Sequence, residues 1–408
     1  MRDKKVCVIG LGYIGLPTAA LLATNGYNVV GVDLNQHAVD TINKGQIHIV
    51  EPDLDAFVRS AVSASRLAAF TKTQPGDIYV ICVPTPFHES EAVPRPNVDY
   101  VLAATRSLIP FVKSGDLVIL ESTSPVGTTE SIAQVLADAG VDVASIHVAY
   151  CPERVLPGKI MTELVENDRI VGGLTPAATQ AVSAFYRSFV RGAVLETDAK
   201  TAEMCKLTEN SFRDVNIAFA NELSLICERE GVDVWNLIRL ANRHPRVNIL
   251  QPGAGVGGHC IAVDPWFIVS RNEKVARLIR TAREVNNSKT QWVIERIKTA
   301  ADEAQDLLGR QLVIACLGLS FKPDIDDLRE SPAMAIAEKL LADGYNVVAV
   351  EPNIENHDMF QLVSLDDALH RADFFVILVR HREFIESNAK RKLADANALD
   401  FCGTLTLS

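Results

Sequence analysis

The sequence predicts an α/β protein in which two doubly wound sheets are joined by a helical middle domain. Short apolar runs alternate with helical stretches over residues 1–195, which is typical of buried parallel strands and their crossover helices. The apolar period becomes helical over residues 196–305, and strands alternate with helices again over residues 306–408. We therefore expect two Rossmann-like domains at the ends of the chain and a helical domain between them.

A glycine-rich turn follows the first predicted strand. The apolar residues 6–9 lead into Gly10, Gly12 and Gly15, spaced as Gly-x-Gly-x-x-Gly, and a helical stretch follows at 16–26. In a dinucleotide site the first glycine permits a tight turn, the second lets backbone N–H groups reach a pyrophosphate, and the third lets the helix pack on the strand. The helix N-terminus adds partial positive charge. The pattern alone is weak evidence, because glycine-rich turns are common.

A carboxylate follows the second predicted strand. This strand, at residues 28–32, ends in Asp33, about 20 residues after the glycine turn. A carboxylate in this place accepts hydrogen bonds from the adenosine ribose hydroxyls, and it repels the 2′-phosphate of NADP. The turn and Asp33 together predict an NAD site, and the alternative is an empty sheet of the same architecture.

Polar loops follow three further predicted strands, at residues 77–83, 116–120 and 145–150. Ligands of doubly wound sheets bind beyond the carboxyl ends of the strands, so these loops are candidates for chemistry. The loops are Pro84-Thr85-Pro86, Glu121 to Thr129, and Cys151-Pro152-Glu153-Arg154. Taken singly, each is better explained as a capped turn, because Ser, Thr and Pro are favoured there for backbone reasons.

Two long helices are expected in the middle of the chain, near residues 201–230 and 273–305. In the first, Lys206, Asn210 and Arg213 recur at i, i+4 and i+7 and therefore share one face. Such a stripe is usually a solvated helix face. The functional alternative is that the lysine and the amide stabilise a developing oxyanion.

A second glycine turn carries a thiol. The run Gly257-Gly258-His259-Cys260 is followed four residues later by Asp264. Glycines let the backbone approach a substrate closely, and a carboxylate one helical turn beyond the thiol is suited to hold a water or accept a proton. The alternative, a tight surface turn with a buried cysteine, is equally compatible with this segment alone.

The last domain begins with a predicted strand at residues 312–318 and the loop Phe321-Lys322-Pro323-Asp324. A helix from about Ser331 and strands at 346–350 and 373–379 follow. This domain lacks the full glycine fingerprint. We therefore expect it to bind the other half of a composite ligand.

The composition is that of an ordinary globular enzyme, with 408 residues, 48% of them hydrophobic, and a formal net charge of −11. This acidic balance gives no electrostatic footprint for nucleic acid. No apolar run approaches the roughly 18 residues of a membrane span, and the N-terminus leads into a strand rather than a signal peptide. The eight cysteines contain no Cys-x-x-Cys pair. We therefore expect reduced thiols, no metal site and a cytoplasmic location.

Together these motifs resemble the UDP-glucose and UDP-N-acetylmannosamine dehydrogenase family over nearly the whole chain. The motifs that carry the resemblance are Gly10 to Gly15, the Ser-Thr-Ser-Pro-Val-Gly loop at 122–127, Cys151 to Arg154, Lys206-Leu207-Thr208-Glu209-Asn210, Gly257 to Cys260, and Phe321-Lys322-Pro323. The end of the chain, residues 401–408, departs from the usual family ending.

The resemblance implies an NAD-dependent, four-electron oxidation of a sugar C6 hydroxyl to a carboxylate. In that chemistry Cys260 adds to an aldehyde, Lys206 and Asn210 hold the oxyanion, and Glu153 or Asp264 activates a water. The cofactor contacts that the resemblance implies are Gly10, Gly12, Tyr13, Ile14, Gly15, Asp33, Thr85, Thr123, Thr129 and Arg329. The implied contacts of the UDP-sugar are Arg154, Val155, Lys206, Asn210, Arg213, His244, Arg246, Gly257 and Lys322.

Within the family, His259 and Val263 are similar to the branch that acts on N-acetylhexosamines, because glucose-type members usually carry serine and lysine there. The expected substrate is UDP-N-acetylmannosamine, for surface polysaccharide synthesis, with UDP-N-acetylglucosamine and UDP-glucose as alternatives. A two-electron hydroxyacid dehydrogenase would have no use for Cys260, and an NAD-binding sensor would keep only the glycines and Asp33. The resemblance also implies a homodimer through the middle helices, with Arg246 serving the partner subunit's site.

Overall fold

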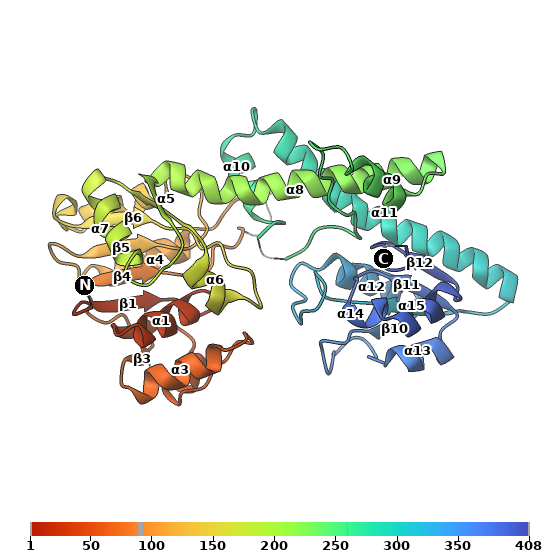
Figure 1. Ribbon diagram of the computed structural model, residues 1–408, viewed down its shortest axis with the longest axis horizontal. Helices are drawn as coiled ribbons and strands as arrows, with labels where there is room; N and C mark the ends of the chain where they lie inside the picture. The colour runs from red at the N-terminus through yellow and green to blue at the C-terminus, as the bar shows by residue number, and fades with distance from the viewer. Residues whose placement is uncertain (1, 89–92, 259, 407–408) are drawn as a thin grey trace. The chain divides into compact units, whose positions relative to one another are not determined.

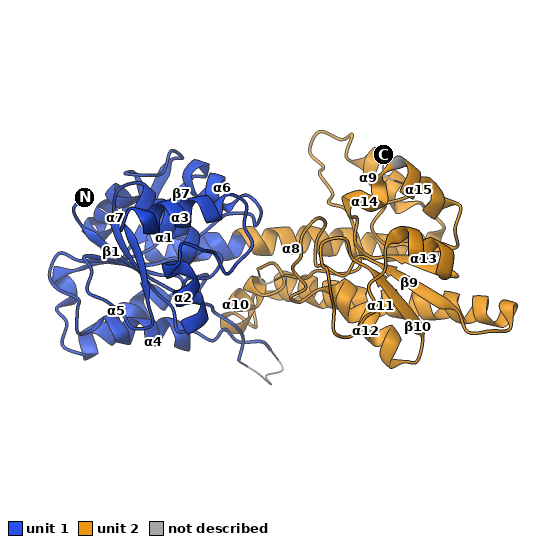
Figure 2. Ribbon diagram, turned by 90° about the horizontal axis from the view of Figure 1, so that it is seen from below, with its two compact units in different colours: residues 1–208 blue, residues 209–408 orange. Residues whose placement is uncertain are grey.

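The structure is a computed structural model that describes residues 2–88, 93–258 and 260–406. The chain forms two compact units, residues 1–208 and residues 209–408 (Figure 2). Each unit contains one β-sheet. Helix α8 (Ala199–Glu230) contains the boundary between the two units.

The sheet of the first unit has the strand order β3-β2-β1-β4-β5-β6-β7-β8 (Figure 1). The strands are β1 (Lys5–Ile9), β2 (Asn28–Val32), β3 (Leu67–Phe70), β4 (Ile78–Ile81), β5 (Leu117–Leu120), β6 (His147–Tyr150), β7 (Arg169–Gly173) and β8 (Val194–Asp198). Strands β1 to β6 are parallel. Strand β7 runs antiparallel to β6, and β8 runs parallel to β7.

Helices cover both faces of this sheet. They are α1 (Gly15–Thr24), α2 (Gln36–Asn43), α3 (Leu54–Ser63), α4 (Asp99–Leu108), α5 (Thr128–Asp138), a 3-10 turn η1 (Val143–Ser145), α6 (Ile160–Glu166) and α7 (Pro176–Tyr186). Alternate residues of a strand point to opposite faces. Accordingly, Val6 and Val8 share a core with α1, α3 and α7, whereas Cys7 and Ile9 share the opposite core with α4 and α5.

The sheet of the second unit has the order β10-β9-β11-β12, and all its strands are parallel. Its strands are β9 (Val313–Leu317), β10 (Asn346–Val350), β11 (Phe374–Ile377) and β12 (Ala398–Asp400). The helices beside it are α11 (Arg277–Leu308), α12 (Pro332–Ala342), α13 (Leu365–Arg371), α14 (Arg382–Ile385) and α15 (Ser387–Ala394). Ile314 and Cys316 share a core with α11 and α12, whereas Ala315 and Leu317 share a core with α13 and α15.

The two sheets begin with the same turn. Gly10 follows β1 and Gly318 follows β9, both with φ of +89°. Each glycine donates its N–H to the last carbonyl of the neighbouring strand, at 2.8 Å in both sheets. An acidic residue comes next on that strand, Asp33 after β2 and Glu351 after β10. The second sheet therefore repeats the architecture of the first, on a smaller scale.

Long helices make up the middle of the chain: α8, α9 (Val234–Ala241), α10 (Asp264–Arg271) and α11. Within the second unit, Asp214 on α8 and Arg283 on α11 form a buried ion pair at 2.7 Å, with side chains 0% and 3% exposed. Asn286 donates to the same carboxylate at 2.8 Å. Burial raises the pKa of Asp214, and Arg283 opposes that rise. A polar network thus connects the two longest helices.

The predicted fold class is confirmed, with two α/β sheets and a helical middle region between them. The helices expected near 201–230 and 273–305 are α8 and α11. The sequence did not indicate that β7 and β8 reverse direction, because the short run Arg169–Gly173 is rich in glycine and has no strong period. The domain bounds 1–195, 196–305 and 306–408 stay a prediction.

Candidate active site

The first glycine turn fits a dinucleotide. A Cβ on Gly10 would lie 2.6 Å from the Cys82 carbonyl oxygen, and one on Gly15 would lie 1.7 Å from the Gly10 carbonyl oxygen. These two positions must therefore be glycine for the turn to close on the sheet. Gly12, in contrast, is exposed and has open space where a side chain would be. This is the position at which a diphosphate is expected to approach the backbone.

The electrostatic setting of this turn also fits a dinucleotide. No described side chain caps the first turn of α1, and no acidic residue lies there, so the partial positive charge of this helix end is left for an anion. Half-buried Asp33 accepts hydrogen bonds from the N–H groups of Leu11 and Asn35, both at 2.9 Å. These bonds fix the carboxylate beside the turn. Half-buried Tyr13 and Ile14 precede α1, and Ile14 is its N-cap.

The predicted cofactor threonines lie in loops at the carboxyl ends of β4 and β5. Thr85 is buried and its Oγ1 donates to the Thr123 carbonyl oxygen at 2.7 Å, which joins the two loops. Thr129, at the start of α5, is fully buried, and its Oγ1 donates to Glu203 Oε1 at 2.6 Å. The structure therefore brings Thr85 and Thr123 together and places Thr129 against an acid that the sequence analysis did not single out.

Glu203 holds the start of α5 against α8. Its carboxylate is fully buried and accepts the N–H of Gly127 at 2.6 Å and the N–H of Thr129 at 2.8 Å, in addition to the Thr129 hydroxyl. Burial raises the pKa of Glu203, and these three donors oppose the rise. An anion at a helix N-terminus is also favoured by the helix dipole. Because Lys206 lies one turn further along α8, Glu203 sets the position of that lysine within the first unit.

Glu153 lies in a buried ion pair. Its Oε2 is 2.8 Å from Arg169 Nη1, and the two side chains are 8% and 3% exposed. Its Oε1 accepts the N–H of Arg154 at 2.6 Å. Arg154 is half-buried and donates to the Asp168 carbonyl oxygen at 3.1 Å, while half-buried Val155 packs against the core. Sequence reasoning missed Arg169, although a charged residue at the start of an otherwise apolar strand was a signal for it.

A second buried acid lies beside this pair. Glu121 follows β5 and accepts hydrogen bonds from the Tyr186 hydroxyl at 2.6 Å and from the Cys82 thiol at 3.2 Å. Burial raises the pKa of Glu121, and Arg169 lowers it. Burial and then Glu121 raise the pKa of the Cys82 thiol well above its ordinary value. Glu121, Cys82 and Tyr186 therefore form a buried, hydrogen-bonded polar cluster at the carboxyl ends of β4 and β5.

The second glycine turn packs against the loop that follows β9. Gly258 has φ of +80°, and a Cβ there would lie 2.7 Å from the Phe321 ring. A Cβ on Gly257 would lie 2.3 Å from the Glu330 carbonyl oxygen. Of the eight free cysteines, Cys260 is the exposed one. Its neighbour His259 lies outside the described residues. An exposed thiol in so close a turn suits a nucleophile rather than a core cysteine.

Asn210 and Asp264 meet within the second unit. Asn210 Nδ2 donates to Asp264 Oδ2 at 2.5 Å, and the two residues are 8% and 3% exposed. Asp264 opens α10 and donates its N–H to the Cys260 carbonyl oxygen at 2.8 Å, so the thiol and the carboxylate share one turn. The helix dipole favours a carboxylate at this end of α10. The alternative of a solvated helix face therefore fails for Asn210.

A polar network supports the segment that leads into this turn. The N–H of Gly253 donates to Asn221 Oδ1 at 2.9 Å, and Asn221 Nδ2 donates to Asn286 Oδ1 at 2.9 Å. Asn286 in turn contacts Asp214. Asn221 and Asn286 are almost completely buried. No local pattern in the sequence indicated these two residues, because their partners lie far away along the chain.

The other predicted substrate and cofactor residues have varied surroundings. Lys206 is half-buried in the first unit, and Arg213 is exposed in the second. His244 and Arg246 are exposed, and the Arg246 N–H donates to His244 Nδ1 at 3.3 Å. Lys322 Nζ lies 5.9 Å from the centre of the Phe321 ring, and Arg329 forms an ion pair with Asp327 at 2.6 Å. The roles of these residues stay predictions.

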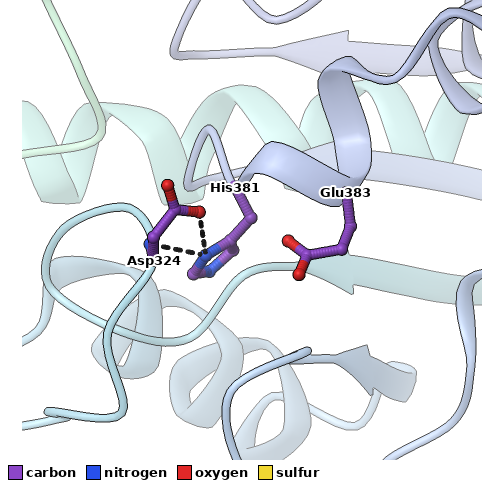
Figure 3. Close-up of side chains that lie close together, drawn as sticks. All are labelled: Asp324, His381 and Glu383. Carbon is purple, nitrogen blue, oxygen red and sulfur yellow. Dashed lines mark hydrogen bonds and ion pairs between the residues drawn. The ribbon is translucent and has the colours of Figure 1, made fainter.

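Asp324, His381 and Glu383 form a cluster with ligand types suited to a metal (Figure 3). His381 is fully buried, however, and both ring nitrogens are used. Nδ1 accepts the Asp324 N–H at 3.0 Å, and Nε2 lies 3.1 Å from Glu351 Oε2. Burial alone would raise the pKa of Glu351, but the hydrogen bond to His381 lowers it to about 2. We therefore interpret the cluster as a hydrogen-bonded support for the loop after β9.

Three family models match the chain in order. Residues 4–190 match the NAD binding domain of the UDP-glucose/GDP-mannose dehydrogenase family, residues 200–288 its central domain, and residues 315–406 its UDP binding domain. The chain belongs to this family. It is an NAD-dependent dehydrogenase, as the glycine turn and Asp33 predicted.

Individual relatives extend over almost the whole chain. The UDP-N-acetyl-D-mannosamine dehydrogenase of Yersinia pestis is 56% identical over 403 residues, which cover 94% of this chain and 95% of that protein. The NDP-N-acetyl-D-galactosaminuronic acid dehydrogenase of Ralstonia solanacearum is 54% identical over 402 residues, covering 95% and 93%. The solved UDP-D-ManNAc dehydrogenase of Pyrococcus horikoshii has a TM-score of 0.88 at 38% identity, covering 99% of this chain and 96% of its own.

Among the helices that the structure describes, none combines the length and the apolar character needed to cross a bilayer.

We expect Asp33→Ala to weaken NAD binding and to reduce the preference for NAD over NADP, because the repulsion of the 2′-phosphate is lost. Titration of the purified variant with each reduced cofactor measures both effects. Asp40→Ala removes an equal charge from the exposed face of α2 and is the matched control. A cofactor preference that is unchanged in Asp33→Ala would remove this carboxylate from the ribose site.

Proposed function

We propose that the protein oxidises C6 of UDP-N-acetyl-D-mannosamine to the carboxylate of UDP-N-acetyl-D-mannosaminuronic acid, for the synthesis of surface polysaccharide. The observation that carries this proposal is the exposed thiol of Cys260 in a glycine turn, one turn before the buried pair of Asp264 and Asn210. A simple alcohol dehydrogenase has no use for such a thiol. The 56% identity with relatives named for this substrate supports the choice of sugar.

In the proposed mechanism, the glycine turn after β1 and Asp33 would hold NAD, which would supply the hydride acceptor for two successive oxidations. A water held by Asp264, with Lys206 nearby, removes the C6 hydroxyl proton in the first step and leaves an aldehyde. The Cys260 thiolate adds to the aldehyde carbon and forms a thiohemiacetal. Loss of its C–H hydride in the second oxidation gives a thioester, and water then releases the carboxylic acid and regenerates the thiol.

Oxyanions form on the sugar oxygen during these steps. Asn210 uses one amide hydrogen for Asp264, and an amide carries two, so the second is left for an oxyanion. Lys206 supplies the positive charge. Glu153 or Asp264 orients the water that attacks the thioester, and both are buried carboxylates with fixed hydrogen bonds.

The UDP group requires cations in a protein that is otherwise acidic. The proposed contacts are Arg154, Val155, Arg213, His244, Arg246, Gly257 and Lys322, with Arg329 reaching the cofactor. The match of residues 315–406 to a UDP binding domain supports placing the nucleotide there.

A second sugar of the same class is favoured by one observation. The Ralstonia solanacearum relative, 54% identical, is named for an N-acetyl-galactosaminuronic acid rather than a mannosamine. The acetamido group is common to both names, whereas the configuration of the ring differs. Both names therefore support a sugar with a 2-acetamido group, whereas the manno configuration is supported by the 56% identical relatives.

We also propose that the protein is a homodimer assembled through α8. Phe212, Phe219 and Ile226 recur every seven residues and so share one face of this helix. They are 68%, 54% and 49% exposed, which is unusual for three large apolar side chains in one row. A second copy would cover them, and Arg246 would then serve the partner subunit's site. Eight free thiols support a cytoplasmic location.

Cys260→Ser is expected to lower turnover on the order of a thousandfold or more, because serine is a far weaker nucleophile, while NAD binding is retained. The wild type is expected to release two NADH for each nucleotide sugar consumed. Cys402→Ser, at a half-buried thiol, is the control. One NADH per sugar, or normal acid production by Cys260→Ser, would contradict the covalent route.

The substrate assignment predicts a kcat/KM for UDP-N-acetylmannosamine above those for UDP-N-acetylglucosamine and UDP-N-acetylgalactosamine. UDP-glucose lacks the acetamide, leaves its binding groups unpaired and is expected to react roughly a hundredfold more slowly, or worse. Steady-state kinetics with the four substrates measure these ratios. A preference for another acetamido sugar would contradict only the proposed manno configuration. Equal use of UDP-glucose would contradict the proposal that the substrate carries an acetamido group.

Replacing both Phe212 and Phe219 by glutamate is expected to convert the dimer into monomers, since charged side chains would be buried against the partner. Sedimentation velocity of the variant and the wild type decides this. Phe70→Glu, at an apolar residue of the first unit that is 38% exposed, is the control and should leave the dimer intact. A wild type that sediments as a monomer at micromolar concentration would refute the dimer.

A further inference from the structure

The buried ion pair of Glu153 and Arg169 arises from the reversed strand β7. Strands β6 and β7 pair antiparallel, with Tyr150 opposite Gly172. Continuing this register three residues outward places Glu153 opposite Arg169. A parallel strand in this place could not bring its first residue to the carboxyl end of β6. Because β7 is antiparallel to β6, the guanidinium of Arg169 lies beside the carboxylate of Glu153.

The guanidinium is held on several sides. Arg169 Nη2 donates to the Leu164 carbonyl oxygen at 3.2 Å, and the guanidinium carbon lies 5.4 Å from the centre of the Tyr186 ring. Burial alone would lower the pKa of Arg169, but Glu153 and other neighbours raise it above its ordinary value. The cation therefore stays charged although it is excluded from water.

Glu153 is in turn fixed through both oxygens, one to Arg169 and one to the Arg154 N–H. Each carboxylate oxygen has a further lone pair, so a water can still donate to it. The ionisable groups that face Glu153 from neighbouring elements are Arg169 on β7, Glu121 after β5, Cys82 after β4 and Cys151 after β6, and Tyr186 on α7 donates to Glu121. Arg169 is the one cation in this set, and it serves two buried acids.

We propose that Arg169 is a positioning residue that holds Glu153 as an oriented carboxylate, so that Glu153 accepts a hydrogen bond from the water that hydrolyses the thioester. This inference rests on the proposed function. It assigns the water to Glu153, leaving Asp264 to the first oxidation and to its bond with Asn210. Without Arg169, both buried acids lose their cation, and the ionised form of each is disfavoured at neutral pH.

The test compares the pH dependence of kcat in the wild type, Arg169→Met and Arg169→Lys. In Arg169→Met the acidic limb of kcat is expected to move up by about 2 to 3 pH units, so that activity lost at neutral pH returns in alkaline buffer. Arg169→Lys restores the charge and is expected to restore most of the profile. Glu153→Gln cannot ionise, so it should lower kcat at every pH and have no such limb.

Arg283→Met is the matched control, because Arg283 and Asp214 form a buried ion pair of similar geometry at 2.7 Å in the other unit. It is expected to lower the melting temperature as Arg169→Met does, without moving the acidic limb. A role for Arg169 in stability alone would lower kcat equally at all pH values and leave the limb where the wild type has it. That result would overturn the inference.

A second measurement needs no substrate, so it separates failure of this inference from failure of the proposed function. In Arg169→Met, Glu153 stays buried without its ion-pair partner, so its folded-state pKa is expected to exceed the unfolded value of about 4.3. Its contribution to stability is full below that pH and is lost as the pH rises through the folded-state pKa. The Tm of Arg169→Met should therefore fall between pH 5 and 8 relative to the Arg169→Met/Glu153→Gln double variant. Parallel Tm curves would refute the charge state of Glu153 even if the wild type oxidises the sugar as proposed.

Discussion

Three hydrogen bonds to the buried carboxylate of Glu203 fix α8 against the start of α5, and the cofactor side of the candidate site depends on this contact. Within the first unit they connect the helix to the loop after β5 and set the position of Lys206. The same helix continues into the second unit, where Asn210 contacts Asp264 and Asp214 contacts Arg283. Within each unit, residues of α8 therefore support one part of the candidate site: the cofactor loops in the first unit, and the turn that holds Cys260 in the second.

The two sheets have similar architecture but differ in the surroundings of one acidic residue, Asp33 in the first sheet and Glu351 in the second. In the first sheet, half-buried Asp33 bonds to backbone N–H groups and keeps oxygen lone pairs for a ribose. In the second sheet the corresponding acid, Glu351, is completely enclosed and bonded to His381 and to the N–H groups of the loop after β9. A ribose could not reach it. The repeated architecture therefore gives one dinucleotide site, and the second sheet is left for a different nucleotide.

The sequence was sufficient for features that depend on neighbours along the chain. The glycine spacing before α1, the acid after β2, the polar loops after buried strands and the thiol that follows two glycines are all features of short segments of the chain. It was insufficient where a partner is distant. In the sequence, Glu203 looks like any other acidic residue on an amphipathic helix. Its hydrogen-bond donor Thr129, on α5, lies 74 residues away along the chain. Arg169 meets Glu153 because β7 runs antiparallel, and Asn221 on α8 meets Asn286 on α11, 65 residues away along the chain.

In the proposed mechanism, Cys260 becomes covalently attached to the sugar during turnover. The direct measurement is the mass of the peptide that contains Cys260, after the wild-type enzyme is mixed with NAD and UDP-N-acetylmannosamine and quenched in acid within a single turnover. We predict an increase equal to the nucleotide sugar at the aldehyde or acyl level, located on Cys260 and removed by hydroxylamine when it is the thioester. Complete conversion to the acid with Cys260 unmodified throughout the time course would contradict the account.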